Sequence, residues 1–312
     1  MNYAETSFYI NNEMTKKDKT TFSEPCRICG VSDWEILYRG PIRTGKFGEY
    51  SKENHVVWKC SKCQSGFISR TPLNYEKSDY REMVDDSDLP RHSYKLHDKE
   101  QADKLTILGT ENIRGKIIVD VGCGVGSFLD VIKGFASKTI AIEPTESFHH
   151  ELEAKGHVTY SYCKDSLKDW SEAVDIVVSF AVLEHIEDPL AILNEIKSLL
   201  KPDGLLLIST PNADDWLLEF LPGIYDRFFY RYVHAWYFNR ESIQYLSQRA
   251  GFKETEIFFK QRYDISNALH WVRDNTPTGT GKFKLLQGMD STYMQLIESL
   301  GRSDYIYAFF RK

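Results

Sequence analysis

Four cysteines near the start of the chain are spaced as metal ligands. Two CxxC pairs, with 30 residues between them, supply Cys26, Cys29, Cys60 and Cys63. Four thiolates in two short knuckles make a tetrahedral all-sulfur site, which suits Zn²⁺. Protein then fills every ligand position, so we expect a structural zinc rather than a catalytic one. The alternative is four unrelated buried cysteines, and disulfides are disfavoured in the reducing cytoplasm that we expect.

A glycine-rich turn follows a strongly apolar stretch in IIVDVGCGVGS. It contains three alternate glycines, at Gly122, Gly124 and Gly126. Glycine lets a backbone turn sharply and approach a ligand closely. Ser127 stands where a dinucleotide-binding loop has its third glycine, which argues against a nicotinamide enzyme. Asp120 precedes the loop, and Glu143 ends the next expected strand, where an acid can accept both ribose hydroxyls of an adenosyl ligand.

Two histidines are candidates for proton transfer. His185 follows Glu184 in VLEHIEDP, directly after an expected strand, and His234 lies in the aromatic segment RYVHAWYF. Histidine, with an unperturbed pKa of ~6.5, suits a general base near neutral pH. We take His234 as the leading base and His185 as a second catalytic candidate, with Glu184 shaping the site. The alternative for His234 is a core histidine bonded to a backbone carbonyl.

The elements that must position these groups alternate between strands and helices from about residue 115. Apolar stretches predict strands at 116–122, 139–144, 175–182, 205–210, 253–264 and 303–312. Amphipathic stretches predict helices at 127–136, 146–156, 189–200 and 240–252. Asp188 is expected to cap the third of these helices. Such alternation is typical of a parallel sheet with crossover helices on both faces.

The chain divides into four expected parts. They are a flexible N-terminus at 1–22, a zinc-binding module at 23–72, a helical linker or lid at 73–105, and the α/β domain at 106–312, with substrate-cap insertions at about 213–238 and 265–302. Aromatic and basic side chains of the linker are candidates to close over the substrate, and the alternative for each is a solvated helix face or a salt bridge: Tyr75, Tyr80, Arg81, His92, Tyr94 and His97. Arg227 and Arg231 are candidates for holding a diphosphate, because a guanidinium matches phosphate geometry.

Charge and hydropathy exclude several partners. The net charge is −6, whereas proteins that bind nucleic acid through its phosphates usually show a basic face. No apolar run approaches the ~18–20 residues of a membrane span, and the first residues show no secretory signal. We therefore expect a cytoplasmic protein with a small-molecule substrate. The oligomeric state is not indicated.

Four motifs resemble those of class I S-adenosylmethionine (SAM)-dependent methyltransferases, over about 115–255. They are VDVGCGVGSF, IEP, VLEHIEDP and LKPDGLLLISTPN. The resemblance implies a Rossmann-like seven-stranded sheet, parallel with one antiparallel strand. It also implies cofactor-binding roles, with Asp120 near the methionine amino group, Gly122, Cys123, Gly124 and Gly126 around the methionine, Glu143 on the ribose, Asp165 of the loop YCKDSL near the adenine, and Ser179 and Phe180 beside the sulfonium.

The order of zinc module, linker, methyltransferase core and a histidine before YF is similar to sugar C-methyltransferases that act on nucleotide-linked sugars. In that family the histidine is the general base and follows a glutamate, whereas Val233 precedes His234 here. O-methylation of a sugar hydroxyl therefore fits as well as C-methylation. We expect methyl transfer to a nucleotide-linked or glycan-precursor sugar. An RNA methyltransferase that uses the zinc module for RNA binding is the alternative.

Overall fold

The computed structural model describes residues 22–45, 48–70, 73, 89–279 and 283–312. Of the expected lid residues, Tyr75, Tyr80 and Arg81 lie outside this set. His92, Tyr94 and His97 are described only through their backbone in helix α1 (Leu89–Leu108). No helix within the described ranges is long and apolar enough to cross a membrane.

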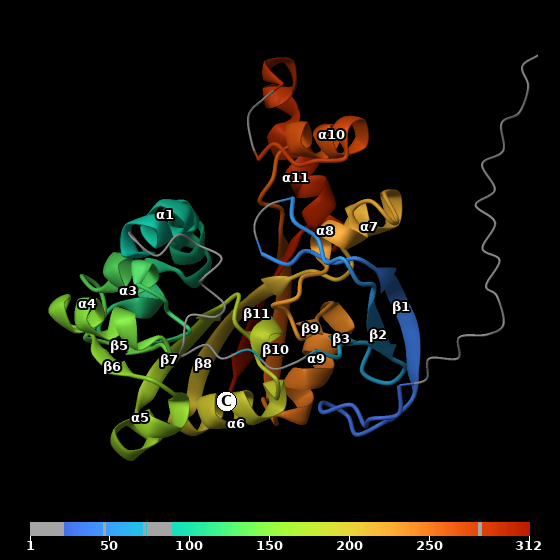
Figure 1. Ribbon diagram of the computed structural model, residues 1–312. Helices are drawn as coiled ribbons and strands as arrows, with labels where there is room; N and C mark the ends of the chain where they lie inside the picture. Colours follow the sequence, from blue (N-terminus) through green and yellow to red (C-terminus); the bar gives the residue numbers. More distant parts are fainter. Residues whose placement is uncertain (1–21, 46–47, 71–72, 74–88, 280–282) are drawn as a thin grey trace, which may run out of the picture.

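A seven-stranded sheet forms the centre of the molecule, in the order β10-β11-β8-β7-β4-β5-β6 (Figure 1). Its strands are β4 (Ile117–Val121), β5 (Lys138–Ile142), β6 (Val158–Tyr160), β7 (Val174–Phe180), β8 (Leu200–Pro211), β10 (Glu254–Lys260) and β11 (Tyr305–Arg311). The strands from β4 to β8 pair in parallel, and β11 runs antiparallel between β8 and β10. This confirms the expected sheet with one antiparallel strand.

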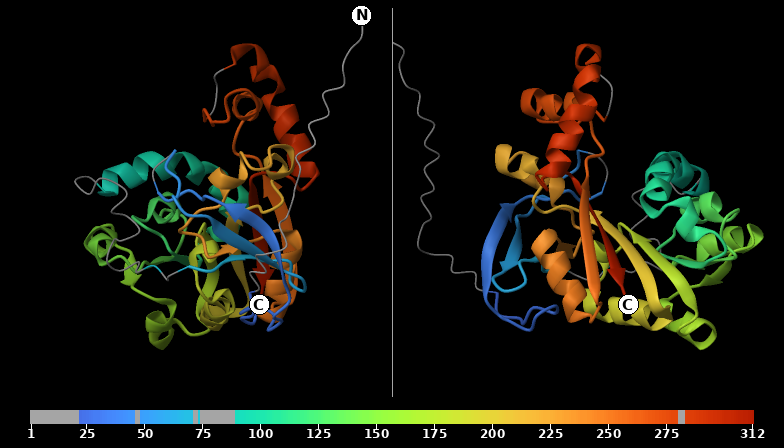
Figure 2. Two further views of the ribbon diagram at one scale, coloured as in Figure 1. Left: turned by 45° about the vertical axis from the view of Figure 1, so that its right-hand side comes forward. Right: turned by 180° about the vertical axis from the view of Figure 1, so that it is seen from behind.

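Helices cover both faces of this sheet (Figure 2). Apolar side chains of α1, α3 (Ser127–Ile132) and α4 (His149–Ala154) pack on one face, against β4, β7 and β8. Those of α5 (Cys163–Trp170), α6 (Pro189–Leu199) and α9 (Arg240–Arg249) pack on the other. Short connecting pieces complete the domain: α2 (Thr110–Ile113), η2 (Glu146–Phe148) and η3 (Leu183–His185). The layered core places the carboxyl ends of β4, β5, β6 and β7 at one edge.

Local sequence signals explain where two of these helices, α6 and α9, begin. The Asp188 side chain accepts a hydrogen bond from the Ala191 amide at 2.9 Å, which confirms the expected cap of α6. Helix α9 begins after Asn239, where the Asn239 and Ser242 side chains each bond to the other's backbone amide. The loop expected around Asp165 is instead strand β6 followed by helix α5. That strand is three residues long and only half-buried, so its sequence shows no strand periodicity.

The four cysteines accompany a second, antiparallel sheet of order β1-β2-β3-β9: Cys60 ends β2, and the other three lie in the turns beside its strands. Its strands are β1 (Trp34–Gly40), β2 (His55–Cys60), β3 (Gly66–Ile68) and β9 (Trp236–Tyr237). The fourth strand does not come from the N-terminal region but from the connection that carries His234. Phe67 pairs with Trp236 across β3 and β9, and their ring centroids are 4.8 Å apart. The two sheets therefore share one segment of chain.

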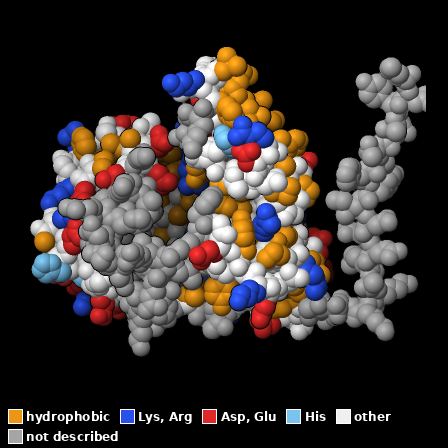
Figure 3. All heavy atoms as spheres, turned by 45° about the horizontal axis from the view of Figure 1, so that its top comes forward, with side chains coloured by type: hydrophobic (Ala, Val, Ile, Leu, Met, Phe, Trp, Pro, Cys, Tyr) orange, Lys and Arg blue, Asp and Glu red, His pale blue; other side chains and the backbone are white. Residues whose placement is uncertain are grey.

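The second expected cap region, 265–302, forms an arm that projects beyond the sheet (Figure 1). It contains α10 (Ile265–Asp274), η4 (Lys284–Met289) and α11 (Asp290–Ser299). Trp271 anchors α10 through edge contacts with Tyr225 and Phe228, next to α8 (Asp226–Phe229) and α7 (Trp216–Phe220). Figure 3 shows hydrophobic side chains along this arm, and Leu285 is 93% exposed. The arm thus rests on the first cap region, 213–238.

Replacement of Gly122 by alanine should destabilise the fold. Gly122 has φ +75°, and a Cβ there would lie 2.4 Å from Val182 Cγ2. We expect Gly122→Ala to lower the free energy of unfolding by about 1–3 kcal/mol, measured by urea denaturation. Gly134→Ala is the matched control, because a Cβ there meets nothing within 4 Å and the φ of Gly134 is not positive. Equal unfolding midpoints for the two variants would contradict this account.

Candidate active site

Three acidic residues lie at the carboxyl ends of three neighbouring strands. Asp120 is in β4, Glu143 follows β5, and Asp165 lies in the first turn of α5 after β6. Asp120 and Glu143 are buried, whereas Asp165 is exposed. Ligands of open α/β sheets bind at this edge, outside the ends of the strands. The arrangement places two buried acids and one exposed acid along a single line of the sheet.

Glu143 is fixed by the glycine loop beside it. One carboxylate oxygen accepts a hydrogen bond from the Gly124 amide at 2.8 Å, and the other accepts one from the Thr145 amide at 3.0 Å. The Gly122 amide also bonds to the Ile142 carbonyl at 2.7 Å. The loop and the acid are therefore positioned by each other before any ligand binds, which limits the ordering that binding requires.

Asp120 is a buried acid beside a buried base. Burial raises the pKa of Asp120 to about 7, the charge of Lys104 opposes this shift, and the charge of Glu143 adds to it. Lys104 itself has its pKa lowered by burial, and its ammonium lies 4.7 Å from the centre of the Phe180 ring. Asp120 can thus change its protonation state near neutral pH.

Lys104 was not identified from the sequence. It comes from α1, in the segment expected to be a linker or lid, and it shares a buried helix face with Gln101 and Leu108. The spacing of Gln101, Lys104 and Leu108 at i, i+3 and i+7 is the signal that was available. It is a weak one, because two of the three residues are polar.

Two further residues expected at the cofactor, Ser179 and Phe180, make contacts within the protein. The Ser179 hydroxyl donates to the Val121 carbonyl at 3.2 Å, so it ties β7 to β4. The Phe180 ring packs edge-on against Phe128 at the start of α3, with centroids 5.1 Å apart. Ser127, by contrast, has a buried hydroxyl oxygen with no hydrogen-bond partner among the described residues. Such an atom next to the glycine loop fits a polar ligand.

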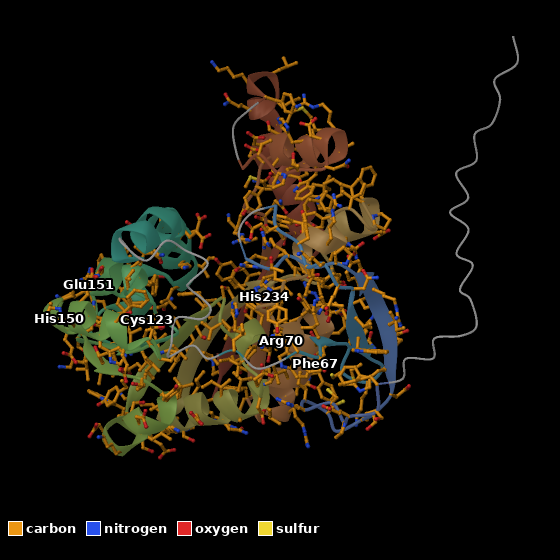
Figure 4. All side chains as sticks on the ribbon, viewed as in Figure 1. Phe67, Arg70, Cys123, His150, Glu151 and His234 are labelled. Atoms are coloured by element: carbon orange, nitrogen blue, oxygen red, sulfur yellow. The ribbon has the colours of Figure 1, made fainter. Side chains whose placement is uncertain are left out.

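The thiol of Cys123 lies within the loop itself. It is partly exposed, and its sulfur lies 3.6 Å from the Gly124 carbonyl oxygen. Figure 4 shows Cys123 on the opposite side of the view from His234, Arg70 and Phe67.

A second cluster brings together Glu184, His185 and His234. One ligand-type atom of each residue lies within 4.8 Å of those of the other two. The two imidazole rings meet edge-on, with centroids 4.7 Å apart and an angle of 89° between the rings. His185 Nδ1 is 3.0 Å from the Val233 carbonyl oxygen, which assigns its proton to Nδ1 and leaves Nε2 as an acceptor. The cluster is thus formed by residues that are far apart in sequence.

Glu184 and His234 are buried, His185 is partly exposed, and positive charge surrounds the cluster. Burial, followed by the charge of Arg231, lowers the pKa of His185 to about 3. Burial and then His185 lower the pKa of His234 well below its usual value. Burial raises the pKa of Glu184 to about 7. Both imidazoles are therefore neutral at neutral pH, and Glu184 is balanced between its two protonation states.

Glu184 provides the carboxyl group that the sequence around His234 lacks. Val233 occupies the position before His234, and its carbonyl binds His185. Glu184 reaches His234 from η3, after β7, and the Ala235 amide donates to its backbone carbonyl at 2.8 Å. The sequence did not predict that Glu184 lies beside His234, because a contact between residues 50 positions apart leaves no local signal.

The charges of Arg43 and Arg231 act on His234 of this cluster, and Arg227 comes from helix α8. Among the described residues, Arg43, Arg227 and Arg231 have no acidic oxygen within 4.0 Å. Burial, and then the nearby Arg231, lower the pKa of Arg43 to about 10. Arg43 stacks over Phe228 at 4.2 Å, and Arg227 lies over the Tyr50 ring at 5.1 Å. Sequence analysis identified Arg227 and Arg231 but not Arg43, which comes from the cysteine-bearing sheet.

The four cysteines of the second sheet are gathered as their spacing predicted. The sulfurs of Cys26 and Cys63 are 3.6 Å apart, and those of Cys29 and Cys60 are 3.4 Å apart. All four lie within 4.8 Å of one another. A tetrahedral site with Zn–S bonds of ≈ 2.3 Å requires sulfur separations of about 3.8 Å. The donor set and its spacing therefore fit one tetrahedral metal ion. Cys123 and Cys163 lie outside the cluster.

Comparison with known proteins agrees with this architecture, that of a class I methyltransferase. A family model described as a methyltransferase domain matches residues 94–257, just over half of the chain. The chain belongs to this family. A solved SAM-dependent methyltransferase from Archaeoglobus fulgidus has the same fold, with a TM-score of 0.50 and 19% identity, over 73% of this chain and 100% of that one.

Curated relatives carry a more specific name. The ubiquinone biosynthesis O-methyltransferase of Actinobacillus pleuropneumoniae serotype 7 is 33% identical over 110 residues, covering 31% of this chain and 47% of the relative. The protein of that name from Neisseria meningitidis serogroup C is 30% identical over 155 residues, covering 42% and 64%. The chain thus spans about half to under two thirds of the length of these relatives.

Proposed function

We propose that this protein transfers a methyl group from SAM to a hydroxyl of a small molecule. The observation that carries the proposal is the pairing of two sites at one sheet edge. One site has the acids and amides that an adenosyl amino acid requires, and the other has two neutral histidines, of which His234 is buried, beside a carboxyl group. The O-methyltransferases among the relatives support a hydroxyl acceptor.

In this proposal the glycine loop and its acids hold the cofactor. Asp120 pairs with the methionine ammonium, the loop from Gly122 to Gly126 surrounds the methionine, and Glu143 accepts from the ribose. Asp165 lies toward the adenine, and Phe180 borders the sulfonium. The bound cofactor supplies an electrophilic methyl group, so the protein chiefly aligns the acceptor with it. Asp120 and Glu143 are buried, which would limit the access of water to the transfer.

The histidine cluster handles the proton of the acceptor. His234 takes the hydroxyl proton, the acceptor oxygen bonds to the methyl carbon, and the carbon–sulfur bond breaks to leave a neutral thioether. An ionised Glu184 beside His234 would stabilise the imidazolium that forms. His185, held by the Val233 carbonyl, fixes the position of His234 through their edge contact.

For the acceptor, we propose a nucleotide-linked or glycan-precursor sugar. A diphosphate needs clustered positive charge, and Arg43, Arg227 and Arg231 offer three guanidiniums that no described carboxylate neutralises. The same groups would accept another anionic small molecule, because a guanidinium binds carboxylates as well as phosphates.

We also propose that the four-cysteine cluster holds one structural zinc ion. A hydrogen bond with the Cys26 thiol lowers the pKa of Cys63, which favours a thiolate ligand at this position. With four protein ligands the ion keeps no open position for chemistry. It would instead hold together a small sheet that has little apolar core of its own.

Metal analysis should find about one zinc per chain. The double variant Cys26→Ser with Cys60→Ser should contain none, because one ligand is lost from each knuckle. Cys123→Ser is the control and should keep its zinc, since Cys123 lies outside the cluster. Zinc retained by the double variant would show that the ion is bound elsewhere.

Substitution of His234 should separate binding from turnover. We expect His234→Ala to lower kcat by roughly 10²-fold or more and to leave the affinity for S-adenosylhomocysteine unchanged. Methyl transfer to a panel of nucleotide sugars, measured by mass spectrometry, and calorimetry with S-adenosylhomocysteine test the two parts. His270→Asn, on the projecting arm, is the matched control. Unchanged turnover in His234→Ala would make His234 a core residue only.

Cofactor affinity should depend on pH through Asp120. With a pKa of about 7, Asp120 is largely protonated below pH 7 and cannot then pair with the cofactor ammonium. Affinity for S-adenosylhomocysteine should therefore rise with pH between 5.5 and 7, by up to roughly tenfold per unit, and level off above about pH 8. Calorimetry over this range tests the slope. Asp120→Asn should bind weakly and show no such rise, and a slope that survives this change would assign the titration elsewhere.

A further inference from the structure

We propose that Glu184, His185 and His234 bind a divalent transition-metal ion, at a second metal site separate from the four cysteines. The inference rests on the proposed function only for what the ion would do, not for its binding. Two imidazoles and one carboxylate are a ligand set that suits first-row metals such as Zn²⁺, Fe²⁺ or Co²⁺.

The geometry of the three residues is that of a preformed ligand set. Their ligand-type atoms lie within 4.8 Å of one another before any ion is present. The segments that carry them are joined by backbone hydrogen bonding, since the Ala235 amide donates to the Glu184 carbonyl at 2.8 Å. The ligands therefore come from two elements that are fixed relative to each other.

His185 has the second hydrogen bond that metal-binding histidines generally have. Its Nδ1–H donates to the Val233 carbonyl at 3.0 Å, which orients the ring and directs the lone pair of Nε2 away from that carbonyl.

Two buried polar atoms of the cluster lack a partner among the described residues. They are Glu184 Oε2 and His234 Nδ1, on side chains whose residues are 1% and 3% exposed. Leaving such atoms unpaired costs free energy, and a single cation between them would satisfy both. Burial also keeps both imidazoles neutral, so their lone pairs are available to a metal.

The surrounding charges determine what else would bind there. The positive charges of Arg231, Arg43 and Arg70 act on the histidines, and Glu184 is the single carboxylate of the cluster. A divalent ion held by Glu184 keeps a positive charge, so the site favours an anionic acceptor as a further ligand. Three protein ligands leave coordination positions open for it, unlike the four-cysteine site.

The ion would give His234 a role different from that of a free base. A hydroxyl bound to the cation becomes more acidic and releases its proton to solvent, and its oxygen is held for the incoming methyl group. His234 then serves as a ligand. The same substitution would abolish turnover in either case, so metal binding has to be measured directly.

Calorimetric titration of the zinc-loaded full chain with Co²⁺ tests the site. We expect about one Co²⁺ to bind per chain with no thiolate-to-cobalt absorption band, which would mark exchange at the cysteines. Glu184→Gln and His234→Asn should each weaken binding by about tenfold or more. His270→Asn should bind like the unchanged protein. Circular dichroism establishes that each variant is folded.

If the variants do not fold, NMR of the unchanged protein with Co²⁺ still tests whether the metal binds at the cluster. Bound Co²⁺ should shift or broaden the ring-proton NMR signals of His185 and His234 and leave those of His270 unaffected. The proposal is overturned if the zinc-loaded protein binds no Co²⁺, if it binds only with the thiolate band, or if both variants bind with undiminished affinity.

The outcome is distinguishable from a failure of the proposed function. Full methyl transfer by chelator-treated, zinc-retaining protein that binds no Co²⁺ would contradict the second metal site and support the proposed methyltransferase activity. Binding of Co²⁺ at the cluster without any binding of S-adenosylhomocysteine would support the second metal site and contradict the proposed methyltransferase activity.

Discussion

The pairing of β3 with β9 is the contact on which the arrangement of the acceptor side depends. Only Gly66 and Phe67 pair with Tyr237 and Trp236, yet this joins the cysteine-bearing sheet to the segment that follows His234. The Ile68 amide donates to the Ala235 carbonyl, and Arg70, whose side chain is 1% exposed, forms an ion pair with Glu187 at 3.0 Å. His234 is thereby held between two sheets rather than on a free loop.

The cofactor side is organised differently, by one stretch of parallel sheet and its own loops. Asp120 and Glu143 are placed by adjacent strands, and the glycine loop bonds to Glu143 directly. This side is built from neighbouring strands and the loops that follow them. The acceptor side draws on η3, on the connection before β9 and on Arg43 of the N-terminal region, and so combines three distant parts of the chain.

That difference explains how far the sequence could predict the site. Six of the seven strands of the larger sheet, the loop around Gly122, the cap at Asp188 and the cysteine cluster follow from spacing and hydrophobic periodicity, which are local properties. Glu184 as the neighbour of His234, Lys104 as the neighbour of Asp120, and β9 as a strand of the second sheet are long-range pairings. A single sequence carries no sign of them, because neither partner has an unusual local pattern.

The pairing of β9 with β3 limits how the protein can be divided into parts. A boundary near residue 72 or 106 separates two sequence patterns, but it does not separate two independent physical units. Without its first 70 residues, the remaining chain would expose Trp236, leave the edge of β9 unpaired and free the segment around His234. The N-terminal part therefore cannot be removed without disturbing the rest of the structure. Any variation in it is constrained by the shape of the acceptor site, and exchange of this part between relatives would have to include residues 231–238 as well.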